Sequence, residues 1–359
     1  MSPFDRARAL VDGTRSRVDR AGTRLHHGLR VLSGLDDPTL GPTPREEIWR
    51  RGPMKLYRYG APTEASTPNT QAEPILIVMS LVTKPTVFDL APGMSFVEIL
   101  LKDGFDVYLL DWGTPGPTEA DNSIADYTLR YLPQVLRVVS DDADGRSVNV
   151  LGYCLGGTLA LLMAAADPDL PLSGIVLVAT PIAFGEMGPI ATMFNSGVVR
   201  VEDAVDETGN VPPSAVANVI KLVKPTGDLT TWLSLWDSLP HRQLLSAHRT
   251  LMAWAGDHIP FPGRAASEFV ELGMRRNTLA TGTFPLDDRV VSLADVRCRV
   301  LNMYGTQDAL VPPAAHEMLS DLLPNAEYEA LAVETGHAGL WVGSKSRKAM
   351  AAMAQWFVR

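Results

Sequence analysis

The sequence predicts an α/β fold with a mostly parallel central sheet. Two short apolar runs, Pro74 to Ser80 and Phe105 to Asp111, are rich in the residues that parallel strands bury on both faces. The segment between them, S-F-V-E-I-L-L-K-D, has the apolar spacing of a helix, so the three together predict a strand–helix–strand unit. The alternation continues with a helix expected over 123–139 and strands over 147–151, 174–179 and 299–304.

Composition favours one large enzyme of the cytoplasm. The chain has 359 residues, of which 46% are hydrophobic and 20% are charged, a size that suits one α/β domain with an insertion. No apolar run approaches the roughly 18 residues of a membrane span, and no secretory segment follows Met1. The two cysteines, Cys154 and Cys298, provide no disulfide framework and suit a reducing compartment.

Charge is unevenly distributed along the chain. The net charge is −9, yet residues 1–60 contain 12 Lys and Arg against 7 Asp and Glu. Apolar residues in this basic arm recur every three or four positions, as in an amphipathic helix. Such a helix either packs on the core or binds a partner protein or a hydrophobic surface. Nucleic acid is excluded as a partner because the acidic remainder of the chain would repel phosphates.

The most informative stretch is Val148 to Ala160, V-N-V-L-G-Y-C-L-G-G-T-L-A. An apolar strand followed by Gly-x-Cys-x-Gly and a small-residue helix predicts a nucleophile elbow with Cys154 at its tip. The flanking glycines favour this interpretation over a buried structural cysteine. A thiolate exchanges acyl groups with another thioester at little thermodynamic cost, so the cysteine indicates acyl transfer from a thiol carrier, with hydrolysis as the rival.

A thiol nucleophile needs a base and an acid to orient that base, and both occur in the order that α/β-hydrolases use. Asp308 follows the strand R-V-L-N-M-Y-G, and His337 lies in the later loop E-T-G-H-A-G. The alternative interpretation is that Asp308 only stabilises its turn before Pro312. We interpret His258 as a cap residue that could approach a pocket; the remaining histidines have no comparable position and are His26, His27, His241, His248 and His316.

The alternation of strands and helices fails between Pro181 and about Ser292, which predicts an inserted cap. We therefore expect an α/β-hydrolase fold with a mostly parallel sheet and a cap. The expected divisions are a basic amphipathic arm (1–60), the first part of the core (61–180), the cap (181–292) and the second part of the core (293–359).

Several further motifs resemble those of a known family over nearly the whole chain. They include P-I-L-I-V-M-S-L-V-T-K-P, G-F-D-V-Y-L-L-D-W-G-T-P, L-G-Y-C-L-G-G-T-L, D-A-L-V-P-P and G-H-A-G-L-W-V-G-S-K-S. The sequence resembles the catalytic subunit of class III polyhydroxyalkanoate synthases, which polymerise (R)-3-hydroxyacyl-CoA and release CoA.

The resemblance implies a role for each site residue. Cys154 would carry the growing chain as a thioester, His337 would activate the thiol and then the incoming 3-hydroxyl, and Asp308 would hold the imidazole. The backbone N–H groups of Leu155 and Val82 would form the oxyanion hole. The CoA thioester is the substrate; no metal or other cofactor is expected, because the three residues have no ligand cluster around them.

The resemblance also implies partners: a second, non-catalytic subunit, a homodimer, and the surface of a polymer granule in the cytoplasm. The chain departs from the family pattern at Thr83, where asparagine is usual, at Thr86, where an aromatic residue is usual, and at Ala183, where aspartate is common. Three alternatives therefore stay open: a cysteine-dependent hydrolase such as a depolymerase, esterase or lactonase, a diverged synthase paralogue, and a binding subunit without chemistry.

Overall fold

The computed structural model describes residues 41–60, 72–223, 250–342 and 344–358. Most of the expected N-terminal arm, residues 1–40, and part of the expected cap, residues 224–249, lie outside this range. No helix of the described residues is both long and apolar enough to cross a membrane.

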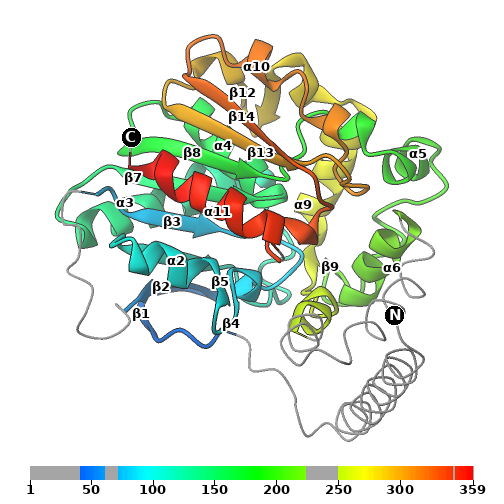
Figure 1. Cartoon of the computed structure of the whole chain (residues 1–359). Helices are drawn as coiled ribbons and strands as arrows, with labels where there is room; N and C mark the ends of the chain where they lie inside the picture. Colours follow the sequence, from blue (N-terminus) through cyan, green and yellow to red (C-terminus); the bar gives the residue numbers. More distant parts are fainter. Residues whose placement is uncertain (1–40, 61–71, 224–249, 343, 359) are drawn as a thin grey trace, which may run out of the picture.

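A twisted sheet runs through the centre of the molecule and confirms the α/β expectation (Figure 1). Within the described residues it has eight strands in the order β1-β2-β6-β3-β7-β8-β13-β14. Only β2 runs against the others; β6, β3, β7, β8, β13 and β14 are mutually parallel. The strands are β1 (Arg45–Arg51), β2 (Met54–Tyr59), β3 (Ile75–Val78), β6 (Val107–Asp111), β7 (Val148–Tyr153), β8 (Leu172–Val178), β13 (Arg299–Gly305) and β14 (Tyr328–Val333).

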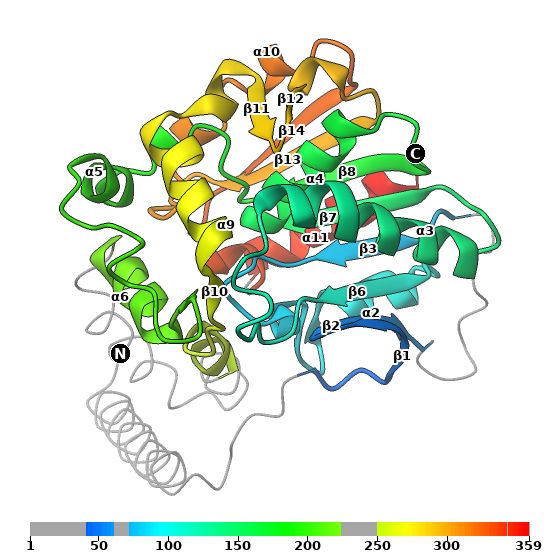
Figure 2. The ribbon, with the colours of Figure 1, turned by 180° about the vertical axis from the view of Figure 1, so that it is seen from behind.

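Helices cover both faces of the sheet, as its apolar strands require. Helices α2 and α11 lie in front in Figure 1, and α3 and α4 lie over the other face in Figure 2. The two faces bury separate apolar clusters, one beneath α2 and α11 and the other beneath α3, α4 and the cap. These helices are α2 (Phe96–Lys102), α3 (Leu132–Asp142), α4 (Leu155–Ala166) and α11 (Ser344–Phe357).

The described residues between β8 and β13 form short helices, one hairpin and a pair of two-residue strands beside the carboxyl ends of the parallel strands. The last of these elements, β12, packs against α4, so the end of the expected cap segment 181–292 lies on the core. The elements are α5 (Pro189–Asn195), β9 (Asn210–Val211), α6 (Pro213–Val223), β10 (Phe261–Pro262), α9 (Gly263–Glu268), β11 (Thr283–Leu286) and β12 (Arg289–Ser292). Elsewhere lie the short elements β4 (Asp89–Ala91), β5 (Met94–Ser95) and α10 (Leu319–Leu322).

The boundary expected at residue 60 is wrong, because β1 and β2 already belong to the central sheet. The sequence did not predict them: β1 is mostly charged and half-exposed, so it lacks the apolar run of a buried strand. Pairing with β2 along the sheet edge stabilises it instead.

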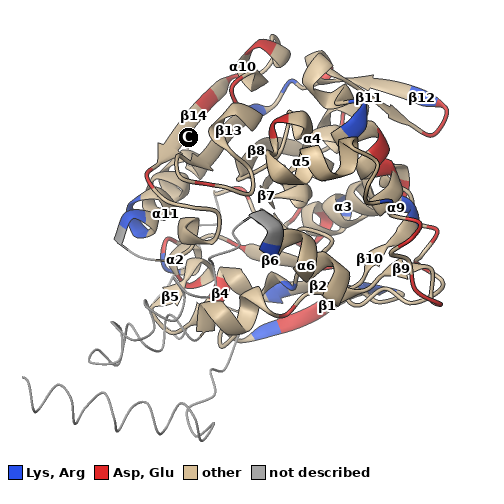
Figure 3. Ribbon diagram, turned by 90° about the vertical axis from the view of Figure 1, so that its right-hand side faces the viewer, with Lys and Arg blue, Asp and Glu red and all other residues tan. Residues whose placement is uncertain are grey.

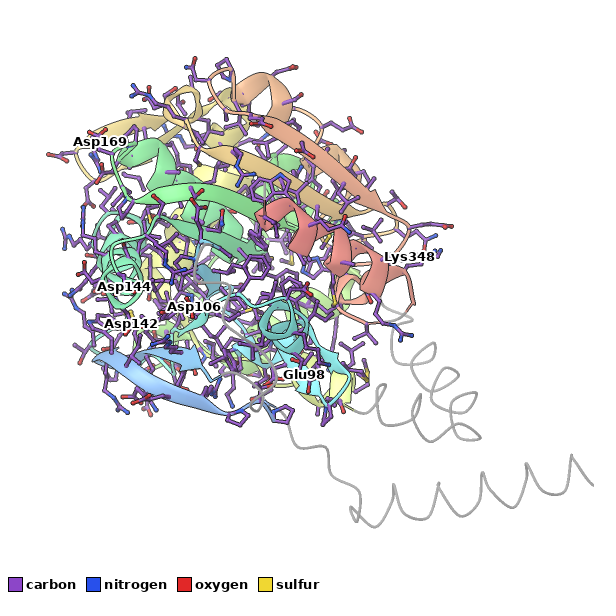
Figure 4. All side chains as sticks on the ribbon, turned by 60° about the vertical axis from the view of Figure 1, so that its left-hand side comes forward. Glu98, Asp106, Asp142, Asp144, Asp169 and Lys348 are labelled. Carbon is purple, nitrogen blue, oxygen red and sulfur yellow. The ribbon has the colours of Figure 1, made fainter. Side chains whose placement is uncertain are left out.

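Charged residues close the amino ends of the parallel strands, opposite the cap. Arg58 lies 3.5 Å from a carboxylate oxygen of Asp106 and 3.3 Å from one of Asp142. In Figure 4 these two aspartates lie at one end of the sheet with Asp144 and Asp169, which precede β7 and β8. Glu98 and Lys348 mark the outer sides of α2 and α11 in the same view. The opposite edge, at the carboxyl ends of the parallel strands, is where sheets of this kind place their sites.

Helix α4 approaches the sheet closely because its first turn contains Gly156 and Gly157. A Cβ atom on Gly157 would lie 1.9 Å from Thr180 Oγ1, and one on Gly156 would lie 2.5 Å from Val78 O. Any side chain at these positions would push the helix away from β3 and β8. The spacing of helix and sheet, and with it the placement of the turn before the helix, depends on these two glycines.

Gly157→Ala is expected to lower the free energy of unfolding by about 1–3 kcal/mol, the usual cost of overpacking. Adding Thr180→Ala removes the clashing atoms Oγ1 and Cγ2 and should restore part of that loss. Urea unfolding measures both effects. Gly60→Ala is the control, because the nearest atom to its added Cβ is 3.9 Å away. Equal losses for Gly60→Ala and Gly157→Ala would contradict the close packing.

Candidate active site

Cys154 occupies a strained turn between β7 and α4. Its φ of 52° and ψ of −126° are unusual for a residue with a side chain, and its N–H donates to Val178 O at 2.9 Å. A Cβ on Gly152 would lie 2.4 Å from the Cα of Gly157, so the turn closes only with glycine there. Strand and helix therefore meet sharply enough to present the thiol beyond the end of the sheet.

Asp308 lies in the loop after β13 with its side chain fully buried. One carboxylate oxygen, Oδ1, accepts the N–H groups of Leu310 at 2.8 Å and Val311 at 3.0 Å. The other, Oδ2, lies 2.7 Å from Nδ1 of His337. Burial alone would raise the pKa of this carboxyl, but the charge and hydrogen bond of His337 and the two amides hold it below its usual value. Asp308 is therefore an anion aimed at the imidazole.

His337 follows β14 and has 17% of its side chain exposed. Burial would lower its pKa, but Asp308 and the adjacent Cys154 outweigh burial and raise the pKa to about 10. Because Nδ1 pairs with Asp308, Nε2 is the nitrogen left for the thiol. The structure thus brings Cys154, Asp308 and His337 together in the geometry of a base held by an acid beside a nucleophile.

An aromatic cluster holds the imidazole in place. The ring of Tyr153 lies 5.1 Å from that of His337 and 5.4 Å from that of Trp341, and Phe88 packs 4.7 Å from Trp341. Tyr153 and Trp341 are almost entirely buried. The position of His337 is therefore fixed by packing as well as by its hydrogen bond.

The expected oxyanion donors, Leu155 and Val82, line one cavity together with Cys154. The D-W-G-T-P motif supports the loop that contains Val82, because the Trp112 indole donates to Met79 O at 2.8 Å. The cap holds this loop from the other side: Ile259 N donates to Val82 O at 3.1 Å, and Trp254 Nε1 donates to Lys84 O at 2.8 Å. Cap and core thus fix the loop jointly.

Two cavities meet at Cys154. One, of about 380 Å³, is bordered by Asp308, His337 and polar groups of the core and cap. The other, of about 190 Å³, extends under α5, α6 and α9 and is apolar. Figure 3 shows α5 and α6 side by side at this edge, both tan over most of their length. We call the first the polar cavity, because the polar and titratable side chains of the site border it although hydrocarbon forms most of its surface, and we call the second the apolar chamber.

His258 lines the polar cavity together with Cys154, and it also pairs as an isolated bridge with Thr83. Burial lowers its pKa, so the imidazole is neutral at neutral pH. Its Nδ1, like Ser80 Oγ in the same cavity, is buried without a protein partner. The structure thus confirms that His258, interpreted as a cap residue that could approach a pocket, reaches one. The sequence did not show that its segment pairs with Thr83.

The three departures from the family pattern have different surroundings. Thr83 borders the polar cavity, whereas the hydroxyl of Thr86 is buried without a protein partner in the short helix that follows. Ala183 is fully buried, and its N–H donates to Ala315 O at 3.0 Å.

Of the other histidines, His316 is buried against Tyr304, and His26, His27, His241 and His248 lie outside the described residues. The described part of the chain contains no group of three or more His, Cys, Asp or Glu side chains placed to hold a metal.

Comparison with known proteins first identifies the class of protein to which the fold belongs. A family model for the alpha/beta hydrolase fold matches residues 87–344, more than half of the chain. The order of the parallel strands, the single reversed strand and the sharp turn at Cys154 define the same class.

Curated relatives narrow this class. The poly(3-hydroxyalkanoate) polymerase subunit PhaC of Haloferax mediterranei is 31% identical over 358 residues, covering 99% of this chain and 69% of that protein. The PhaC subunit of Synechocystis sp. is 31% identical over 366 residues, covering 99% and 95%. That of Allochromatium vinosum is 29% identical over 337 residues, covering 93% of each. The chain belongs to the PhaC family of poly(3-hydroxyalkanoate) polymerase subunits, which confirms the resemblance seen in the sequence.

The two cysteines are expected to differ in reactivity. Burial raises the pKa of the Cys298 thiol to about 12, so almost no thiolate forms there at neutral pH, whereas Cys154 lies beside His337 and lines both cavities. Iodoacetamide at neutral pH should therefore alkylate Cys154 first, as peptide mass spectrometry measures. His337→Gln should slow this labelling. Faster labelling of Cys298 in the folded protein would contradict the site.

The pairing of His337 and Asp308 predicts a pH-dependent contribution to stability. Because the pKa of His337 rises from 6.5 to about 10 on folding, the contribution is fully present below pH 6.5 and is lost as the pH rises towards 10. The free energy of unfolding of the wild type should exceed that of Asp308→Asn, and this difference should be largest at pH 6 and smallest at pH 10. Urea unfolding of both proteins, with His337→Gln as a second variant, measures this. A difference that is independent of pH would refute the pairing.

Proposed function

We propose that this protein is an acyltransferase that polymerises (R)-3-hydroxyacyl groups from their CoA thioesters into polyhydroxyalkanoate through Cys154. The observation that carries the proposal is a thiol at the elbow, beside a His337–Asp308 pair, in a chain that belongs to the PhaC family. The relatives are named as polymerase subunits, and the site has the groups that acyl transfer between thiols requires.

The first step is acylation of the enzyme. His337 takes the proton of Cys154, and the sulfur attacks the thioester carbonyl of the substrate. The amides of Leu155 and Val82 stabilise the oxyanion, and the carbon–sulfur bond to CoA breaks. CoA leaves as a thiol with the proton from His337. One thioester replaces another, so the energy of the acyl group is kept for the next step.

The second step forms the ester. The 3-hydroxyl of an incoming 3-hydroxyacyl-CoA attacks the Cys154 thioester while His337 takes the hydroxyl proton. An ester bond forms, and the thiol of Cys154 is released and reprotonated. The extended chain, now on CoA, returns to Cys154 by a repeat of the first step. Asp308 stabilises the imidazolium that forms each time. No metal or further cofactor takes part in this scheme.

We further propose that the protein works in the cytoplasm at the surface of polymer granules, as a homodimer and with a second, non-catalytic subunit. The family membership and the basic amphipathic sequence of residues 1–60 support these partners. Co-purification of a second subunit from the source cells, with an increase in CoA release when it is added back, tests them.

Cys154→Ala is expected to lower CoA release from (R)-3-hydroxybutyryl-CoA and longer homologues by about 10⁴-fold or more, because it removes the nucleophile. Insoluble polyester should disappear with it. Cys298→Ala is the matched control and should retain both activities, since Cys298 borders neither cavity. Thiol release and polymer mass, measured together, distinguish a polymerase from a hydrolase. Release of CoA without polymer, even with a partner subunit present, would identify a hydrolase instead.

A further inference from the structure

The apolar chamber has a composition that the acyl-transfer scheme does not by itself require. Among the described residues that line it, every side chain other than those of Cys154 and Arg200 is hydrocarbon or thioether. Arg200 is 60% exposed and lies 3.6 Å from Glu202, so its guanidinium faces outward. The interior of the chamber is therefore apolar from its outer rim to the nucleophile.

Three cap helices and one aromatic cluster form its walls. Helix α5 packs against α6, and the ring of Phe269 after α9 lies 6.0 Å from both Phe184 and Phe261. The Arg275 side chain donates to Phe194 O at 3.3 Å and so joins the wall after α9 to the end of α5. The chamber is thus a packed feature of the cap and ends at Cys154 and Leu155.

The size of the chamber suits a short alkyl chain. Its volume of about 190 Å³ exceeds the roughly 150 Å³ of apolar cavities that stay dry and bind a benzene-sized guest. A guest attached to the sulfur of Cys154 enters without further loss of translational freedom.

The growing polyester fits this chamber poorly, because every repeat unit has an ester group. Burying esters away from water without hydrogen-bond donors is unfavourable, and the chamber walls offer no polar side chain inside the rim. The polar cavity is bordered by polar side chains, those of Thr83, His258, Gln307, Asp308 and His337 among them. Ester, hydroxyl and amide groups therefore belong in the polar cavity, and hydrocarbon belongs in the apolar chamber.

We infer that the apolar chamber binds the alkyl side chain of the acyl group on Cys154 and so selects 3-hydroxyacyl thioesters whose side chain is longer than methyl. The inference rests on the proposed function only in taking the acyl group to be a 3-hydroxyacyl group. Each methylene that enters the chamber should accelerate acylation of Cys154 about fourfold, which corresponds to about 0.8 kcal/mol.

Saturated acyl-CoA thioesters test this without requiring polymerisation, since they acylate the thiol and cannot extend a chain. In that step the Cys154 sulfur bonds to the acyl carbon, and CoA leaves as the protonated thiol. Butyryl-, hexanoyl- and octanoyl-CoA carry methyl, propyl and pentyl groups beyond the third carbon. Intact-mass spectrometry gives the acylation rate of each. We expect hexanoyl-CoA to react about 16-fold faster than butyryl-CoA, from two methylenes.

Two alanines of α6 provide a matched pair of variants. Ala215 lines the chamber, whereas Ala217, two residues further along the same helix, does not. Ala215→Phe should reduce the ratio of octanoyl to butyryl rates to near one, and Ala217→Phe should keep the wild-type ratio. Ala266→Leu, on the α9 wall, repeats the test if Ala215→Phe proves unstable in thermal unfolding.

Equal acylation rates for the three thioesters in the wild type would overturn the inference. An equal fall in the acylation rates of all three thioesters in Ala215→Phe, together with shorter polymer, would also overturn it. That result would place the growing chain in the chamber. Faster acylation by the longer thioesters, with no polymer formed from 3-hydroxyacyl-CoA, would support the role of the chamber and refute the proposed polymerase activity. The two failures are therefore distinguishable.

Discussion

The turn at Cys154 is the constraint on which the site depends. A residue with a side chain holds a φ of 52° there, at a cost of order 1–3 kcal/mol that the packing of β7 and α4 must offset. Gly152, Gly156 and Gly157 allow strand and helix to meet closely enough for this. Relaxing the turn would move the thiol away from His337 and from both cavities, so the nucleophile, base and oxyanion donors act only as long as the turn is closed.

The two cavities give each part of a hydroxyacyl substrate a surrounding that matches its polarity. Core loops after β3, β7, β13 and β14, together with His258 of the cap, supply the charged and polar groups, whereas cap helices supply the hydrocarbon walls. Val82 borders both cavities, and the cap segment around Trp254 and Ile259 holds the loop that contains it. The cap therefore contacts the loop that contains Val82 directly, beside the cavity that ends at Cys154.

Local patterns were sufficient to predict much of this structure. The buried strands β3, β6, β7, β8 and β13 were expected within a few residues of their observed ends, because parallel strands buried on both faces have continuous apolar sequences. The three residues Cys154, Asp308 and His337 were predicted as site residues because each follows a strand in the turn or loop at its carboxyl end, where parallel sheets place their sites. Strand β1 at the sheet edge and its neighbour β2 were missed, since β1 is largely exposed and β2 is buried only at alternate positions, so neither has a continuous apolar run.

Features that depend on distant contacts were not predictable from one sequence. His258 reaches the polar cavity only because its segment pairs with Thr83, 175 residues earlier in the chain. The apolar chamber is likewise assembled from residues between 82 and 310, and no local pattern shows that their side chains enclose a space. The glycines that flank Cys154 predicted a sharp turn into α4, but they did not predict the close contact of that helix with Thr180.

The central claim is that Cys154 holds a growing ester chain. Rapid acid quenching of the enzyme during turnover of an (R)-3-hydroxyacyl-CoA, followed by peptide mass spectrometry, tests it most directly. The account predicts a ladder of masses on the Cys154 peptide, spaced by one 3-hydroxyacyl unit and removed by hydroxylamine, as thioesters are. A single acyl unit with no ladder, or a ladder on any other residue, would contradict it.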